Sequence, residues 1–145
     1  MVKILVKKFD KNIELPVYKT SGASGMDLMA YIKDKITINP GKTAMIPTGI
    51  AVAIPKNYEI QIRPRSGLAI KKGISVLNTP GTIDSDYRGE IKIILINLSK
   101  KSFIVKSGDR VAQMILCPIA KVKFKEVKFL PGTVRGKAGF GSTGK

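Results

Sequence analysis

The sequence predicts an all-β sandwich or barrel with one short helix, and three observations lead to this fold class. Short runs rich in Val, Ile and other strand-forming residues recur along the chain. Gly, Pro and Asn separate these runs, as turns between short strands require. Only one stretch has a helical pattern. A length of 145 residues suits a single hydrophobic core, so we expect one domain.

Ten runs are the expected strands, and in chain order they cover residues 3–9, 35–38, 43–46, 50–54, 58–63, 74–77, 90–98, 102–105, 110–118 and 121–129. In the run 58–63, Tyr58, Ile60 and Ile62 fall on one face, and the polar residues between them fall on the other. This period of two is typical of a strand with one face buried.

The last run, 121–129, alternates lysines with apolar residues such as Val122 and Phe124. Lysines at every second position commonly protect an edge strand from pairing with other chains. We prefer this structural interpretation over a nucleic-acid-binding stripe.

The helical stretch is "SGLAIKKG", which begins at Ser66 and ends at Gly73. Leucine, alanine and isoleucine form its apolar part, and two lysines precede the glycine. Ser66 is a candidate N-cap, and Gly73 is a candidate stop.

The chain becomes glycine-rich at about Gly132, so we expect a β domain over 1–131 and a flexible segment over 132–145. Residues 139–145 match the GxGxxG and GxxxxGK patterns. Both patterns bind phosphate at the start of a following helix, and we expect no helix beyond Lys145. Two interpretations stay open, a disordered tail and a flap that wraps phosphate and carries a stacking ring.

The composition limits the possible functions. The chain has no histidine, which excludes Ser-His-Asp and Cys-His triads and removes the commonest ligand of transition metals. Its single cysteine, Cys117, lies among apolar residues and is expected to pack in the core. The start of the chain does not resemble a signal peptide, and no apolar run approaches the roughly 18 residues that span a bilayer. We therefore expect a cytoplasmic protein without a membrane partner.

The chain carries 26 Lys and Arg against 10 Asp and Glu, a formal net charge of +16. Such a charge attracts polyanions such as nucleic acid or nucleotide phosphates, although a solvated lysine coat explains most of it equally well. Against this background, "GTIDSDYRGE" places Asp84, Asp86 and Glu90 close together beside Tyr87. Neighbouring carboxylates repel, so this cluster needs a cation, a hydrogen-bond donor or a catalytic role.

Five segments in order resemble the motifs of the trimeric deoxyuridine triphosphate nucleotidohydrolases (dUTPases): 23–30, 63–74, 78–93, 108–116 and 135–144. The resemblance implies a jelly-roll-like β fold and a homotrimer with three sites at the subunit interfaces. It also implies that the C-terminal segment of a neighbouring subunit closes over each site. The implied reaction converts dUTP and water to dUMP and pyrophosphate with Mg²⁺ on the triphosphate. That reaction removes dUTP from the nucleotide pool and supplies dUMP for thymidylate synthesis.

The resemblance assigns the base-recognition and catalytic roles to one hairpin. Asp84 matches the carboxylate that activates the attacking water, and a general base of ordinary acidity suits this chemistry. Tyr87 matches the ring beneath the deoxyribose, where a ribose 2′-hydroxyl would clash. Asn78 and the backbone from Thr82 through Ile83 to Asp84 match the part that reads uracil.

The remaining matched residues surround the phosphates and the ring. The phosphate-binding group contains Arg65, Ser66, Gly67 and Gln113, with Lys92 as a possible backbone contact. The tail group contains Arg135, Phe140, Gly141, Ser142 and Thr143, in which Phe140 stacks on uracil. The resemblance implies no direct protein ligand for the metal, although Asp27 matches an acid that supports the metal through water. A turn role for Asp27 is equally open. For Asp86, Arg88, Glu90, Asp109 and Arg110 we expect interface ion pairs or turn bonds.

Two rival functions stay in view. A dCTP deaminase would share the fold and release ammonia, but its longer chain and glutamate motif are not evident. A basic nucleic-acid-binding module would explain the charge, yet aromatic residues make up only 6% of the chain. We therefore expect nucleic-acid binding to be at most weak and non-specific.

Overall fold

The computed structural model describes residues 1–139. Its elements, in chain order, are β1 (Leu5–Lys8), β2 (Met26–Met29), β3 (Ile36–Ile38), β4 (Thr43–Pro47), β5 (Ile50–Ala53), β6 (Tyr58–Arg63), α1 (Ser66–Lys72), β7 (Ile74–Val76), β8 (Gly81–Ile83), β9 (Lys92–Asn97), β10 (Phe103–Val105) and β11 (Arg110–Pro118). No helix in the described part of the chain is long and apolar enough to cross a membrane.

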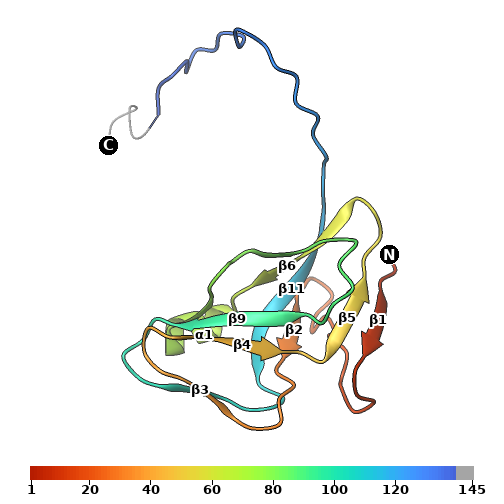
Figure 1. The fold of residues 1–145 in the computed structure, drawn as a ribbon, viewed down its shortest axis with the longest axis vertical. Coiled ribbons are helices and arrows are strands. Elements are labelled where there is room, and N and C mark those ends of the chain that lie inside the picture. Colours follow the sequence, from red (N-terminus) through yellow and green to blue (C-terminus); the bar gives the residue numbers. More distant parts are fainter. Residues whose placement is uncertain (140–145) are drawn as a thin grey trace.

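The strands form small antiparallel sheets that pack around a common core (Figure 1). The largest sheet has the order β2-β11-β6-β8, and a second has the order β4-β9-β7. Two pairs, β1-β5 and β10-β3, complete the barrel-like body. The predicted all-β class with one short helix is therefore confirmed for the described residues.

Alternation along the strands builds the core. In β9, Ile93 and Leu95 point inward and are fully buried, whereas Lys92 before them is exposed and Ile94 between them is half-buried. In β6, Ile60 and Ile62 are buried as predicted. Burying such side chains contributes roughly 1.5–3 kcal/mol each, so these inward rows are the main source of stability.

The helix lies where the sequence predicts it, but its start differs by one residue. Arg65 occupies the N-cap with an extended backbone, no side chain caps the helix, and Ser66 is the first helical residue. The prediction of a Ser66 N-cap was therefore wrong. The predicted stop is confirmed, because Gly73 adopts the left-handed conformation with φ 65° and its N–H bonds back into the helix.

Three strand predictions differ from the structure. Short strands β2 and β8 were missed, because β2 contains Asp27 and β8 begins with Gly81, and both residue types are depleted in strands. The predicted strand over 121–129 is absent, since this segment has no ladder partner within the described residues and is exposed throughout. Alternation alone does not make a strand, because a strand needs a neighbour to receive its hydrogen bonds.

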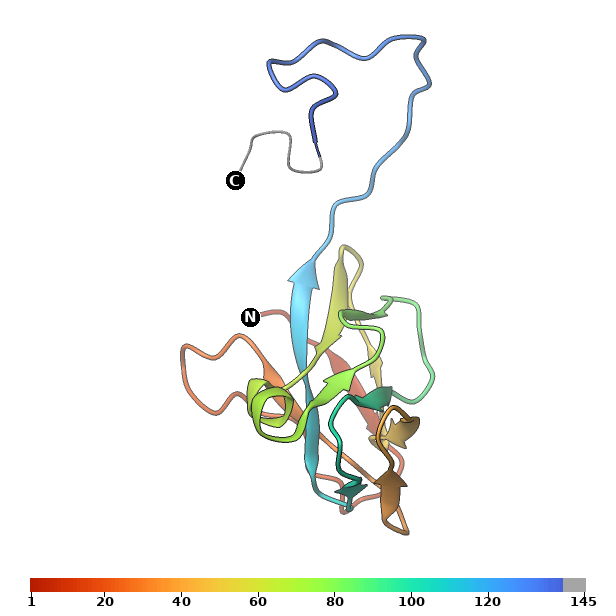
Figure 2. The ribbon, with the colours of Figure 1, turned by 90° about the vertical axis from the view of Figure 1, so that its left-hand side faces the viewer.

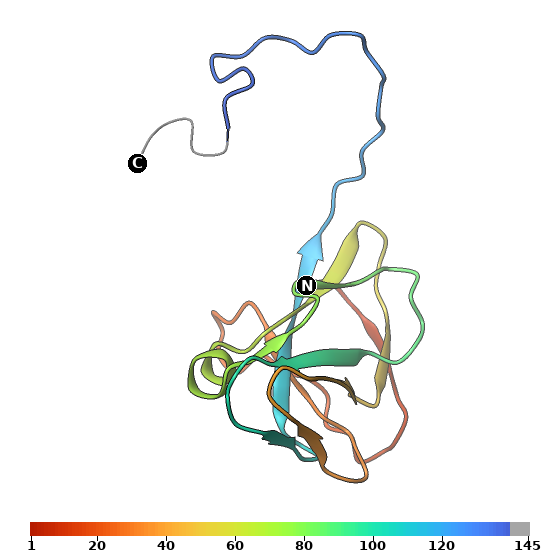
Figure 3. The same ribbon diagram turned by 60° about the vertical axis from the view of Figure 1, so that its left-hand side comes forward.

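The chain leaves the β domain after β11 (Figure 2). The segment that follows runs away from the body in each view, as Figure 3 also shows. Its apolar side chains are unusually exposed, including Phe124 at 93% and Phe129 at 88%. Exposed apolar residues in such number are typical of surfaces that bind another molecule.

Candidate active site

One group of predicted site residues meets at the edge of the largest sheet. Strand β11 pairs with β2 on one side and β6 on the other, so Gln113 lies opposite both Asp27 and Arg63. Residues directly opposite in a sheet share one face. Arg65 follows the end of β6 and brings its guanidinium back to this face.

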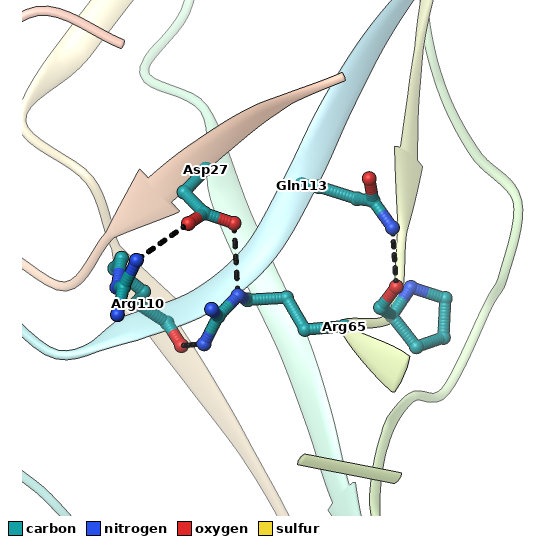
Figure 4. Close-up of polar contacts among 5 residues, drawn as sticks. Asp27, Arg65, Arg110 and Gln113 are labelled. Atoms are coloured by element: carbon teal, nitrogen blue, oxygen red, sulfur yellow. Dashed lines mark hydrogen bonds and ion pairs between the residues drawn. The ribbon is translucent and has the colours of Figure 1, made fainter. Parts of the chain in front are cut away.

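Hydrogen bonds join Asp27, Arg65 and Arg110, and Gln113 lies on the same face (Figure 4). We call these four residues the phosphate cluster. Arg65 Nε donates to Asp27 Oδ1 at 2.8 Å, and an Arg110 guanidinium nitrogen donates to Asp27 Oδ2 at 3.2 Å. Arg65 also donates to the Arg110 carbonyl oxygen at 3.1 Å. Asp27 thus orients two guanidinium groups, which are suited to bidentate contacts with phosphate.

Gln113 is held in this cluster by its amide, whose Nε2 donates to the Pro64 carbonyl oxygen at 2.9 Å. Gly25 leaves room for it, because a Cβ at that position would lie 2.6 Å from Gln113 Oε1. The side chain is therefore held by a backbone carbonyl oxygen on one side and has room on the other because residue 25 is glycine.

Ser66 and Gly67 begin α1 directly beside the phosphate cluster, and both are exposed. The first amide groups of a helix have no acceptor within it, and here no side chain caps them. Their N–H groups are thus available to a phosphate from the solvent side.

A second group, the hairpin group of Thr82, Ile83, Asp84, Tyr87 and Lys92, lines a cavity of about 230 Å³ together with Met45 and Glu90. The Tyr87 hydroxyl donates to the Glu90 carbonyl oxygen at 2.9 Å, and the Tyr87 amide donates to the Asp84 carbonyl oxygen at 3.1 Å. These bonds fix the ring across the turn beside Asp84.

The acidic residues of this hairpin have different environments. The Glu90 carboxylate accepts a hydrogen bond from the Gly49 amide at 2.9 Å, and Lys92 Nζ lies 3.9 Å from it. Asp84 is exposed, and none of the ion pairs within residues 1–139 includes it. Asp86 is exposed as well, but of these two aspartates Asp84 is the one that lines the cavity beside Tyr87.

The two groups do not meet within one chain. Ile83 pairs with Ile60, whereas Gln113 pairs with Arg63 at the other end of β6. Ile83 and Gln113 are therefore offset by three residues along the strands, which is about 10 Å, and by two strand spacings across the sheet, which is also about 10 Å. The groups also line different cavities, one containing Asp84 and one containing Arg65.

The other predicted residues lie outside both groups. Asn78 is exposed at the base of the hairpin, near Gly81. Arg135 lies on the C-terminal segment, where its Nε donates to the Ala138 carbonyl oxygen at 2.9 Å. Phe140, Gly141, Ser142 and Thr143 lie outside the described residues.

Arg110 belongs to the phosphate cluster, although the sequence analysis expected it in an interface or turn pair. Simple alternation would place Arg110 and Gln113 on opposite faces of β11. A register shift between Arg110 and Ala112 inserts one extra residue, so Arg110 lies opposite Met29 on the face of Asp27. No pattern in the sequence marks this bulge.

A larger cavity of about 470 Å³ lies elsewhere, between residues 12–16 and β2. It contains none of the predicted site residues. Near it, the Asn12 amide donates to Asp10 Oδ1 at 2.7 Å and lowers the pKa of Asp10 below its ordinary value. Its size alone does not make it the active site.

The sequence pattern that defines the dUTPase family matches residues 11–144. The chain belongs to the dUTPase family. A deoxyuridine 5′-triphosphate nucleotidohydrolase of Hydrogenobaculum sp. (strain Y04AAS1) is 56% identical to it over 143 residues, covering 99% of both chains. The resemblance predicted from the five segments is thus confirmed.

Solved structures of dUTPases have the same fold. A variant of the Staphylococcus bacteriophage 80alpha dUTPase with dUpNHpp is 25% identical, with a TM-score of 0.87 and coverage of 99% of both chains. A dUTPase from phage phi11 of S. aureus, which coordinates a structural Mg(II) ion, is 22% identical, with a TM-score of 0.80 and coverage of 90% of this chain and 99% of that chain. These likenesses confirm the predicted jelly-roll-like fold class.

Proposed function

We propose that this dUTPase family member hydrolyses dUTP to dUMP and pyrophosphate, in sites shared between the subunits of a homotrimer. The family match and the named relative at 56% identity support the reaction. The observation that carries the shared site is the separation of Asp84 from the phosphate cluster within one chain. A second subunit can supply the missing half of each site.

Asp84 is the proposed general base. Its solvent-accessible carboxylate can accept a proton from water while the water oxygen attacks phosphorus. The bridging P–O bond between the α- and β-phosphates breaks, and pyrophosphate leaves.

The hairpin is the proposed reader of the nucleoside. Tyr87 is held by its bond to the Glu90 carbonyl oxygen, so its ring forms a firm wall that leaves no room for a ribose 2′-hydroxyl. Asn78 and the backbone of Thr82 and Ile83 would form hydrogen bonds with the donors and acceptors of uracil. A mispaired polar group in such a pocket costs about 1–3 kcal/mol, which disfavours cytosine.

The triphosphate is proposed to bind the phosphate cluster. Arg65, Ser66, Gly67 and Gln113 would contact it directly, and Arg110 joins this set because it shares Asp27 with Arg65. Lys92, in the hairpin group, would contact the substrate through its backbone. The segment 132–145 is the proposed flap of a neighbouring subunit, with Phe140 on uracil and with Arg135, Gly141, Ser142 and Thr143 around the outer phosphates.

Magnesium is the proposed cofactor, and the chain's residues fit an ion that is held mainly by substrate. Within the described residues, no three His, Cys, Asp or Glu side chains group into a metal site. Both Asp27 oxygens already accept hydrogen bonds from guanidinium groups, so Asp27 could support the ion only through water. When bound to the triphosphate, the ion would neutralise charge on the phosphate oxygens.

A cytoplasmic location is part of the proposal. The only cysteine, Cys117, has no partner for an internal disulfide, as is usual for proteins of reducing compartments.

The direct test is to incubate the purified protein with Mg²⁺ and each deoxynucleoside triphosphate, and to identify the products. We expect dUMP and pyrophosphate from dUTP and little turnover of the others. Ammonia release from dCTP would instead identify a deaminase. Intact dUTP in the presence of Mg²⁺ would refute the proposed reaction.

A further inference from the structure

Four lysines line one surface hollow at the end of the helix. Lys71 and Lys72 come from the last turn of α1, and Lys100 and Lys101 come from the loop between β9 and β10. All four residues are exposed. The hollow, which we call the lysine hollow, has a volume of about 720 Å³. None of the predicted site residues lines it.

The backbone that carries these lysines is held in place from within. The fully buried side chain of Asn97 donates to the Lys101 carbonyl oxygen at 2.8 Å, and its Oδ1 accepts the Ser99 amide at 2.9 Å. The Leu98 amide donates to the Gly73 carbonyl oxygen at 2.8 Å, which joins this loop to the end of α1. The two lysine pairs are therefore preorganised around the hollow, which reduces the entropy cost of binding.

No negative side chain balances these four charges. The hollow has no Asp or Glu in its lining, and none of the ion pairs within residues 1–139 includes any of the four lysines. The helix dipole accounts for Lys71 and Lys72, because cations are favourable at a helix C-terminus. It does not account for Lys100 and Lys101, which lie on a loop.

Apolar side chains form part of the same lining, and we call them the apolar floor. Ile70 is 84% exposed, Ile104 is 44% exposed and Phe103 is half-buried. Exposed apolar surface next to positive charge suits a ligand with flat apolar groups on an anionic backbone. Four cations along the lining of a hollow of about 720 Å³ can contact several consecutive phosphates, whereas a single phosphate group would use only some of them.

We propose that the lysine hollow binds single-stranded nucleic acid without sequence preference, with the lysines on consecutive phosphates and the apolar floor against bases. This binding site is separate from the site proposed for dUTP. It accounts for part of the net charge of +16 that nucleotide hydrolysis does not require. Binding of this kind depends on phosphate contacts, so it weakens steeply with salt.

The test measures binding of a fluorescein-labelled oligothymidylate of about 12 nucleotides by fluorescence anisotropy over a series of salt concentrations. The hollow variant combines the substitutions Lys71→Gln, Lys72→Gln, Lys100→Gln and Lys101→Gln. The control variant, which loses four exposed lysines elsewhere, combines Lys3→Gln, Lys11→Gln, Lys33→Gln and Lys56→Gln. Both variants lower the formal net charge of +16 by four, so they separate a local site from general charge.

We expect the hollow variant to bind at least about tenfold more weakly than the control variant, with a salt slope lower by about 0.7 for each lost phosphate contact. Equal weakening in both variants, or no binding by the unmodified protein at low salt, would overturn the proposal. Preference for a duplex would overturn the single-strand assignment. The assay contains no dUTP, so its outcome does not depend on the proposed hydrolysis.

Discussion

The carboxylate of Asp84 stands out at the scale of single residues. In a chain with a net charge of +16, Glu90 is held by an amide and a lysine and Asp27 by two arginines, whereas Asp84 is exposed to solvent. A carboxylate that orients arginines cannot easily give up its partners to take a proton. The accessible one can, which is why the two aspartates are assigned different roles.

Asp84→Asn tests the proposed base. The amide keeps the size of the side chain but cannot accept the proton, so turnover of dUTP should fall on the order of 10²-fold or more. Binding of a non-hydrolysable dUTP analogue, measured by calorimetry, should stay within a few-fold of the unmodified protein. Near-normal turnover would show that another group activates the water.

Asp27→Asn tests the positioning role of Asp27. Loss of its charge weakens both guanidinium contacts, so Arg65 and Arg110 lose their fixed orientation toward the triphosphate. We expect KM for dUTP to rise about tenfold, with a smaller change in kcat.

The matched control is Asp34→Asn, which removes the same charge at an exposed loop position. It should leave both constants unchanged. A KM that stays at its original value in Asp27→Asn would mean that the arginines are oriented by other groups.

At the scale of elements, irregular positions decide which side chains reach the site more than the regular strands do. The bulge in β11 brings Arg110 to the face of Gln113, and the first turn of α1 presents Ser66 and Gly67 beside it. Asn97, at the end of β9, has the same kind of effect on the loop that follows. The bulge interrupts a strand ladder, and Asn97 joins its loop to Ile38, which is far away in the sequence.

Asn97→Ala tests the loop. The substitution leaves the Ile38 and Lys101 carbonyl oxygens and the Ser99 amide without their partner inside the protein. Unsatisfied buried groups cost roughly 1–3 kcal/mol each, with partial relaxation, so we expect a loss of about 3 kcal/mol in the free energy of unfolding.

Urea denaturation at fixed protein concentration measures this loss. The exposed Asn12 offers a control, since Asn12→Ala should change the free energy of unfolding by less than about 0.5 kcal/mol. Equal values for the two variants would contradict the structural role of Asn97.

Deletion of residues 133–145 tests the proposed flap. The β domain ends its last strand at Pro118, so the core should stay folded, with an unchanged far-UV spectrum and thermal midpoint. Turnover of dUTP should fall at least about tenfold, because an open site admits water and loses phosphate contacts. An unfolded core would show that the segment is structural.

At the scale of the whole molecule, two features of the single chain favour the proposed assembly. The hairpin group and the phosphate cluster lie at different ends of β6, and Phe124 and Phe129 have no cover within the described residues. Closed symmetric assembly would address both features, because each copy can supply what its neighbour lacks.

Mixing two inactive variants tests this shared site. Neither Asp84→Asn nor Arg65→Ala should be active alone. If Asp84 and Arg65 come from different subunits, co-refolding them in equal amounts should restore about a quarter of the activity, since random assembly leaves that share of sites intact. No recovery, despite subunit exchange shown by mass spectrometry, would place both residues in one chain's site.

Local patterns were sufficient for much of the fold. Period-two alternation located β6, a run of strand-forming residues located β9, and the glycine after two lysines located the end of α1. The same signal failed for 121–129, where the alternation is present but no partner strand lies beside it. Strands β2 and β8 were missed because Asp27 and Gly81 belong to residue types that are depleted in strands.

The sequence by itself determined the fold class and, through five ordered segments, the family, because both depend on residue type and spacing along the chain. Only the tertiary structure decided that Arg110 faces Asp27 and that Asp84 lies apart from Arg65. The reason is that register, bulges and strand order are fixed by hydrogen bonds between distant segments, and a linear pattern does not record which distant segments meet.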